Sequence, residues 1–395
     1  MISRIIIVDA AVRDAYGHFA IYTEGLYLAA LERGFAVRCA VSRACDNVAD
    51  RFGGEKILNF PAWGNASLAR FTYAGNWVNC GVVASEGYAR LQDFDLTPND
   101  LLLVHSIQPH ELFGLGVWYK SVPQNLRPRM SIGLHTDAEM YAGDEDRDLV
   151  NILYAKSLSI FKEFVESGSV ELNSTNDRLS EYMTGLAGCR VRTAPLIVPT
   201  DDFPHRTIKT SCTTKRFLYS GSSSEKGINT IYELCLLLRS NPLHNTQLIV
   251  HISQKNVAQQ FEQAIGKVSG VEIISGSLSR KDYANLFVSA DAILLPYALA
   301  AYARRASGML SEALSLGIPA IVTPDTPMSD ELINNGLPGR ILTSVTPHAV
   351  RVAMNELSLD FDIRSRIANN NKYYFAEKLT ANRYLSEVIS SFKSK

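Results

Sequence analysis

The sequence predicts an α/β protein of two doubly wound domains, each with a parallel sheet buried between helices. Short apolar runs rich in Ile, Val and Leu alternate with longer helical patterns, which is typical of βαβ units, and this alternation occurs twice. The chain has 395 residues, more than a single hydrophobic core usually supports. A segment rich in Pro, Thr and Ser, residues 193–214, separates the two series and is typical of an interdomain linker.

The first series contains six apolar runs that we expect to form buried strands. They are Ile5 to Ala10, Ala36 to Val41, Ile57 to Pro61, Leu101 to His105, Met130 to His135 and Val170 to Asn173. Helical segments separate most of them, and the first long helix is expected to end at Gly34.

The second series repeats the pattern. Its expected strands are Phe217 to Ser220, Gln247 to Ile252, Val271 to Ser275, Ala292 to Pro296, Ala320 to Thr323 and Arg340 to Leu342. Three helix starts carry capping residues: Ser279 stands three residues before Asp282, Thr346 precedes Pro347, and Thr380 opens the last helix.

The linker sets the domain boundary. We place it near Val198, so that residues 1–198 form the first domain and residues 199–372 the second. Doubly wound sheets bind ligands at the carboxyl ends of their strands. Functional residues are therefore expected at strand ends, in a cleft between two facing domains.

The composition argues against several classes of protein. A formal net charge of -1 indicates no basic surface for nucleic acid. The six cysteines form no Cys-x-x-Cys pair, so a reducing, cytoplasmic compartment is expected. The apolar run Ile5 to Val8 is too short for a signal peptide. The run Ala292 to Ala303 is interrupted by Pro296 and is too short for a membrane span.

The strongest local signal for function runs from Arg216 to Gly227. Here a strand leads through the small residues after Gly221 and Ser222 to Lys226, just before a helix begins. A lysine beside a helix N-terminus and a loop of free amides suits a diphosphate. The spacing is not that of a Walker A loop. The alternative is an ordinary flexible connection with an exposed lysine.

A second signal follows the strand that ends at Pro296 and Tyr297. Ser307, Gly308 and Met309 stand at the start of a helix whose amides are free for an anion. Glu312, about one turn into that helix, is placed to accept hydrogen bonds from two vicinal ribose hydroxyls. The alternative is a surface glutamate stabilised by the helix dipole.

Together these segments resemble the C-terminal domain of GT-B glycosyltransferases, most closely the retaining family called GT4. The resemblance extends from about Phe217 to Gly336 and includes the segment Glu312 to Ile321, Glu-Ala-Leu-Ser-Leu-Gly-Ile-Pro-Ala-Ile. It implies two Rossmann-like domains facing a cleft and transfer with retention of anomeric configuration. It also implies that residues 373–395, with a helix from Tyr373 to Phe392, return to the first domain.

The resemblance implies roles for individual residues. Lys226 meets the donor diphosphate with the phosphate loop of Gly221 and Ser222, and Glu312 holds the ribose. Further residues expected to bind the substrate are Gly276, which lines the base pocket, Tyr297, and the start of the second helix at Ser307, Gly308 and Met309. Ser222 stands where the family usually has arginine, and Arg304 where it has glutamate. Arg305 is expected to supply the missing positive charge.

The first domain is expected to contribute histidines and a glycine. Gly17 and His18 follow the first strand, where the family has a glycine loop beside the donor and acceptor. His18 is also consistent with a surface position. His135 ends a strand at the cleft. The resemblance to the family implies that it contacts the transferred sugar or stabilises charge, and His105, at the end of the preceding strand, is its competitor.

The predicted reaction moves a hexose-type sugar from a nucleoside-diphosphate donor, UDP- or GDP-linked, to a glycan or lipid-linked hydroxyl, in surface polysaccharide synthesis. No cofactor and no metal are expected, because the sequence has no His/Cys cluster. A further hypothesis is that the segment near Trp118 and Tyr119 contacts the inner face of the membrane. Formation of a homo-oligomer is also compatible with the sequence. Alternatives are a nucleotide-sugar hydrolase or epimerase and a non-catalytic partner subunit. A dehydrogenase is disfavoured because Gly114 and Gly116 lack the rest of a dinucleotide fingerprint.

Overall fold

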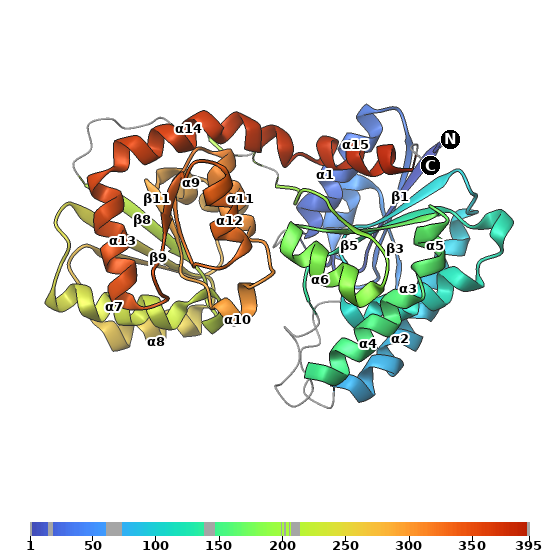
Figure 1. The fold of residues 1–395 in the computed structure, drawn as a ribbon, viewed down its shortest axis with the longest axis horizontal. Helices are drawn as coiled ribbons and strands as arrows, with labels where there is room; N and C mark the ends of the chain where they lie inside the picture. The colour runs from blue at the N-terminus through green and yellow to red at the C-terminus, as the bar shows by residue number, and fades with distance from the viewer. Residues whose placement is uncertain are drawn as a thin grey trace. The chain divides into compact units, whose positions relative to one another are not determined.

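The computed structural model describes residues 2–14, 19–60, 73–137, 147–198, 200, 203–204, 206 and 214–392. It divides into two compact units (Figure 1). Unit 1 consists of Met1–Ile197 and Thr380–Lys395, and unit 2 of Val198–Leu379. Each unit is an α/β structure around a parallel sheet, which confirms the predicted fold class.

Unit 1 contains a seven-stranded sheet within the described residues. Its strands are β1 (Arg4–Asp9), β2 (Ala36–Ser42), β3 (Gly54–Leu58), β4 (Asp100–Val104), β5 (Arg129–Leu134), β6 (Val170–Ser174) and β7 (Val191–Thr193). Its α-helices are α1 (Phe19–Glu32), α2 (Tyr73–Ala89), α3 (Pro109–Ser121), α4 (Arg147–Ser159), α5 (Lys162–Glu166), α6 (Asp177–Ala187) and α15 (Ala381–Ser391). The strand order is β3-β2-β1-β4-β5-β6-β7, so β1 and β4 adjoin at the point where the order reverses.

Both faces of this sheet are buried, because apolar residues at successive positions of its central strands belong to cores on opposite faces. Ile6 and Val8 of β1 belong to a core shared with α2, α3, α4 and α6. Ile5 and Ile7 belong to a second core with α1 and α15, which lie side by side in Figure 1. Tyr384 and Leu385 of α15 therefore return the end of the chain to unit 1.

Unit 2 repeats the same winding. Its strands are β8 (Lys215–Ser220), β9 (Thr246–Ile252), β10 (Val271–Ser275), β11 (Ala292–Leu295), β12 (Ala320–Val322) and β13 (Gly339–Ile341). Its α-helices are α7 (Ile228–Ser240), α8 (Lys255–Ile265), α9 (Arg280–Ser289), α10 (Leu299–Tyr302), α11 (Gly308–Ser315), α12 (Pro327–Asn334), α13 (Pro347–Leu359) and α14 (Phe361–Lys378). The order β10-β9-β8-β11-β12-β13 places β8 beside β11 at the reversal.

Three expectations about the elements need correction. β7 was not predicted, because Val191–Thr193 is short and merges into the polar linker. β3 begins at Gly54 rather than near Ile57, since its polar start is held to β2 by an Arg38–Glu55 ion pair of 2.6 Å. The helix expected from Tyr373 to Phe392 is two helices.

The break between those two helices moves the unit boundary. Thr380 caps α15 by accepting the backbone N–H of Arg383 at 3.1 Å, and α14 ends at Lys378. The final segment of unit 1 therefore starts at Thr380, whereas the sequence placed it at residue 373.

Trp118 and Tyr119 are core residues, only 2% and 0% exposed. They supply no apolar surface for the membrane contact considered above. No α-helix in the described ranges has the length and apolarity to cross a bilayer.

Gly114 and Gly116 serve helix packing. A Cβ on Gly114 of α3 would lie 2.3 Å from the carbonyl oxygen of Gly81 in α2, and one on Gly116 would lie 2.9 Å from the side chain of Ile160. The absence of a side chain therefore lets α2 and α3 pack closely (Figure 1).

We expect Gly114→Ala to destabilise unit 1 by about 2 kcal/mol, because the added methyl group forces α2 and α3 apart. Gly185→Ala in α6 is the matched control, since a Cβ there meets no atom within 4 Å. That change should be neutral or stabilising by up to about 1 kcal/mol. Urea unfolding followed by circular dichroism measures both, and equal midpoints for the two variants would contradict the packing argument.

Candidate functional site

The loops that follow β8 and β11 meet at the carboxyl edge of the unit 2 sheet. Gly227 ends the 3₁₀ turn η6 (Ser224–Lys226) with a φ of +82°, and a Cβ there would lie 2.0 Å from the carbonyl oxygen of Pro296. The backbone N–H of Ala298 donates to the carbonyl oxygen of Glu225 at 2.8 Å. Only glycine fits this contact, which joins the two loops at the strand-order reversal.

Lys226 is thereby brought close to Arg305. Burial lowers the pKa of Lys226, and the positive charge of Arg305 lowers it further, while Glu225 and Glu312 act in the opposite direction. Arg305 itself lies 3.6 Å from Glu225 and over the ring of Tyr302. Each of these two cations therefore has a carboxylate close by, and together they carry two positive charges at this edge of the sheet.

The start of α11 follows Arg305 closely in the chain. The hydroxyl of Ser307 caps the helix by accepting the N–H of Leu310 at 3.3 Å, and Gly308 is the first helical residue. The hydroxyl of Tyr297 is 3.6 Å from the sulfur of Met309. Burial raises the pKa of Tyr297 well above its usual value, while the hydrogen bond with Ser307 and the charge of Arg305 lower it. The predicted residues of this segment therefore gather at one helix N-terminus.

Glu312 of α11 is held by two residues of α9. Its Oε2 accepts the hydroxyl of Tyr283 at 2.7 Å, and its Oε1 is 3.5 Å from a guanidinium nitrogen of Arg280. Burial raises the pKa of Glu312, whereas Tyr283, Arg280 and the charge of Lys226 lower it. Phe203 packs against both α9 residues, with the Arg280 guanidinium 4.6 Å from its ring centre.

Sequence reasoning missed Arg280 and Tyr283. They lie 32 and 29 residues before Glu312, on a helix whose pattern is that of an ordinary surface helix. The available signal was their spacing of three residues, which places two hydrogen-bond donors on one helix face.

The remaining predicted residues of unit 2 tie the neighbouring loops together. A Cβ on Gly221 would lie 3.0 Å from the Cβ of Lys226, so this glycine lies directly against the lysine. The hydroxyl of Ser222 is 2.9 Å from that of Ser253 and accepts its backbone N–H at 3.1 Å. The carbonyl oxygen of Gly276 lies 3.0 Å from Nε2 of His251. Ser222 is therefore hydrogen-bonded to Ser253, in the loop that follows β9.

In unit 1 the structure brings His105 and His135 together. Nε2 of His135 hydrogen-bonds the backbone carbonyl oxygen of His105. Both histidines line a cavity of about 20 Å³. That volume admits little more than one water molecule, which needs about 10–15 Å³ by the same measure. Gly17 and His18 lie outside the described residues.

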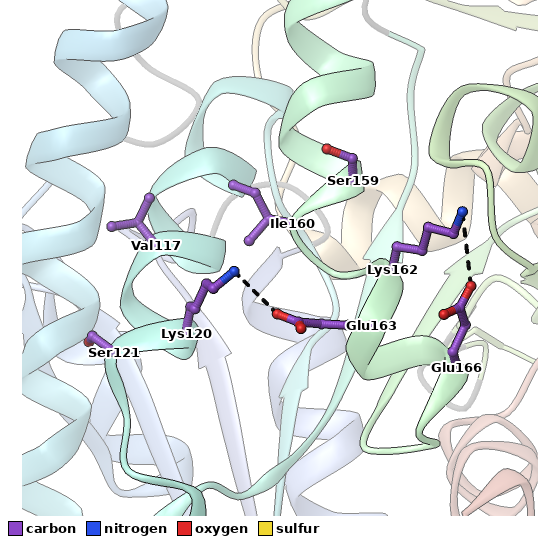
Figure 2. A pocket seen from close by; sticks show the side chains of 8 residues that line it. All are labelled: Val117, Lys120, Ser121, Ser159, Ile160, Lys162, Glu163 and Glu166. Carbon is purple, nitrogen blue, oxygen red and sulfur yellow. Dashed lines mark ion pairs between the residues drawn. The ribbon is translucent and has the colours of Figure 1, made fainter.

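A larger hollow of about 650 Å³ lies elsewhere on unit 1 (Figure 2). Its walls are the ends of α3 and α4 and the short helix α5, with Lys120 3.3 Å from Glu163 and Lys162 4.0 Å from Glu166. α3 ends and α5 begins at the amino edge of the parallel sheet, opposite the strand ends where such sheets bind ligands. These exposed pairs are surface ion pairs.

Glu111 is a buried carboxyl in the first turn of α3. Its Oε2 accepts the backbone N–H of Gln108 at 3.2 Å. Burial raises the pKa of Glu111 to about 8; the Gln108 hydrogen bond and Arg13 oppose this rise, and Asp9 adds to it. Within the described ranges, no three His, Cys, Asp or Glu residues are grouped to hold a metal ion.

Comparisons with known proteins agree with this geometry. Residues 205–373 match the model of the family "Glycosyl transferases group 1". No curated protein sequence matches the chain.

Three solved structures illustrate the likeness of the whole chain. The trehalose-6-phosphate synthase OtsA has a TM-score of 0.69 at 14% identity, covering 100% of this chain and 99% of that one. WaaG, a glycosyltransferase involved in lipopolysaccharide biosynthesis, has 0.59 at 16%, covering 98% and 99%. Anabaena Alr3699/HepE in complex with UDP has 0.64 at 14%, covering 98% and 100%. At these identities the likeness shows the fold, which is GT-B with two Rossmann-like domains.

We expect Glu111→Gln to stabilise unit 1 increasingly as the pH rises. A folded pKa above the unfolded value adds stability that is complete below about pH 4.5 and is lost as the pH rises through about 8. Glutamine mimics the protonated carboxyl and has no such loss. The gain over wild type at pH 9 relative to pH 5 should be a few kcal/mol, at about 1.4 kcal/mol per pKa unit. Chemical denaturation at both pH values measures it, with exposed Glu86→Gln as control. A pH-independent difference would contradict it.

Proposed function

Because residues 205–373 form a group 1 glycosyltransferase domain, the chain is a glycosyltransferase, and we propose that its donor is a nucleoside-diphosphate sugar. The sugar is of hexose type, linked to UDP or GDP, and passes to a hydroxyl of a glycan or glycolipid. The observation that carries this proposal is the proximity of Lys226, Arg305 and Glu312 in unit 2: Arg305 lies 3.6 Å from Glu225, the neighbour of Lys226, and Arg305 and Glu312 both act on the pKa of Lys226.

The chemistry follows from where charge develops. When the bond from the anomeric carbon to the diphosphate breaks, negative charge grows on the leaving phosphate oxygen. Lys226, Arg305 and the amides of Gly308 and Met309 stabilise that charge with little reorganisation, because their loops are already fixed. This role needs no metal ion. Arg305 exchanges its contact with Glu225 for the diphosphate when the donor binds.

Glu312 binds the ribose in the same scheme. As a carboxylate it accepts hydrogen bonds from two vicinal hydroxyls, and Gly276 lies by the base. His135 of unit 1 contacts the transferred sugar. The transfer retains the anomeric configuration, as the resemblance of the sequence to GT4 implies.

The acceptor is the least constrained partner. The names of the similar structures cover a sugar-phosphate synthase and a lipopolysaccharide enzyme, so fold alone selects neither. We propose a cytoplasmic role in surface polysaccharide synthesis. Arg304, where the family has a glutamate, favours one alternative, a non-catalytic partner subunit.

We expect Lys226→Ala to lower the transfer rate about 10²- to 10³-fold and to weaken binding of the matching nucleoside diphosphate. Isothermal titration with UDP, GDP and ADP, together with the rate of donor consumption, measures both. Exposed Lys281→Ala in the same unit is the matched control and should retain wild-type values. Undiminished binding and turnover in Lys226→Ala would overturn the phosphate assignment. Failure of wild type to bind any of the three nucleotides would favour the non-catalytic alternative.

We expect Tyr283→Phe to move the pH dependence of nucleotide binding upward. The hydroxyl of Tyr283 stabilises the ionised form of Glu312, so its removal raises the pKa of that carboxyl further. Binding that requires ionised Glu312 weakens as the pH falls through this pKa, and in the variant the weakening begins at a higher pH. Titrations from pH 5 to pH 8 test this, with Tyr232→Phe in α7 as control. Superimposable pH profiles would show that Glu312 does not bind the ribose as a carboxylate.

A further inference from the structure

The tautomer of His135 follows from its backbone partner. Nε2 of His135 hydrogen-bonds the carbonyl oxygen of His105. A carbonyl oxygen can only accept, so Nε2 must carry the hydrogen. The neutral imidazole is therefore the Nε2–H tautomer, and Nδ1 is its basic nitrogen.

Gly133 makes room for this hydrogen bond. A Cβ on Gly133 would lie 2.7 Å from the carbonyl oxygen of His105 and 3.2 Å from Nε2 of His135. The first distance is too short for a real side chain, and the second would require the His135 ring to shift by a few tenths of an ångström. Any larger residue at position 133 would displace one of the two partners.

The side chain of the same residue, His105, is held by a buried polar group. His105 directly follows β4, and its ring reaches β1 and α1. Nε2 of His105 lies 3.1 Å from Oδ2 of Asp9 and 3.1 Å from the hydroxyl of Thr23. Asp9 also accepts the backbone N–H of Ala11 at 2.8 Å. Asp9, Thr23 and His105 are at most 3% exposed, so little solvent competes for these contacts.

We propose that Gly133 and the buried group Asp9–Thr23–His105 are positioning residues, which fix the tautomer and direction of His135 through the carbonyl of His105. The inference rests on the proposed function only for its effect on catalysis. The hydrogen bond itself is a property of unit 1. A buried carboxylate and hydroxyl thus orient a backbone acceptor, which in turn orients the imidazole.

The tautomer is measured directly by long-range ¹H–¹⁵N correlation on the full chain labelled at its 8 histidines. Comparison with His135→Asn assigns the His135 signals. We expect wild-type His135 to show the Nε2–H pattern. Gly133→Ala and Asp9→Asn should shift it toward a mixture of tautomers. Ser131→Ala is the matched control on the same strand, because the Ser131 hydroxyl bonds Asn173 and not the His105 carbonyl.

Kinetics then separate positioning from catalysis. With the donor that binds wild type, Gly133→Ala should lower kcat about tenfold or more while KM for the donor stays near wild type, and Ser131→Ala should change neither. An Nδ1–H pattern in wild type, or an unchanged pattern in Gly133→Ala, would overturn the proposal. A shifted tautomer with an unchanged kcat would support the positioning and overturn the role of His135 in transfer.

Discussion

The contact of Gly227 with the carbonyl of Pro296 constrains the whole unit 2 site. The positive φ of Gly227 and a virtual Cβ distance of 2.0 Å leave no room for a side chain. This contact packs the turn after β8 against the loop after β11. β8 and β11 are the two neighbouring strands at which the strand order of the sheet reverses. Lys226 and Arg305 are consequently held on facing loops rather than on one flexible segment. The placement of these two positive charges is thus set by backbone geometry.

The charges in this site are nearly balanced before any ligand binds. Lys226 and Arg305 lie near Glu225 and Glu312, and each cation is close to a carboxylate. Burying unpaired cations would be costly, so these acids offset the charge of the two cations. Under the proposed function, a bound diphosphate would replace Glu225 as the partner of Arg305. Glu312 keeps its own partners, Tyr283 and Arg280, on α9 and can act elsewhere on the ligand.

The sequence predicted the parts of this site that are local in the chain. Lys226, Ser307 and Glu312 each stand at a fixed distance after an apolar strand, and parallel winding brings strand ends to one edge. It could not predict the pairing of Tyr283 with Glu312, because that contact depends on how α9 packs against α11. Ser222 shows the same limit. Its place in the loop was predicted. Its hydrogen bond to Ser253 was not, because Ser253 directly follows β9 and comes close only when β9 pairs with β8. The short strand β7 was not predicted, because three residues are too few to show an alternation of apolar and polar side chains.

The two units use different means to fix a reactive group. In unit 2 charged side chains are balanced against one another, so protonation of Glu312 alters the site. In unit 1 the partner of His135 is a backbone carbonyl, which does not take up a proton in the pH range of proteins. The tautomer of neutral His135 is therefore independent of pH, and its orientation depends on whether the His105 backbone stays in place. That backbone follows the last residue of β4, where ladder hydrogen bonds end, which is why the Asp9 and Thr23 contacts to the ring of His105 are needed there.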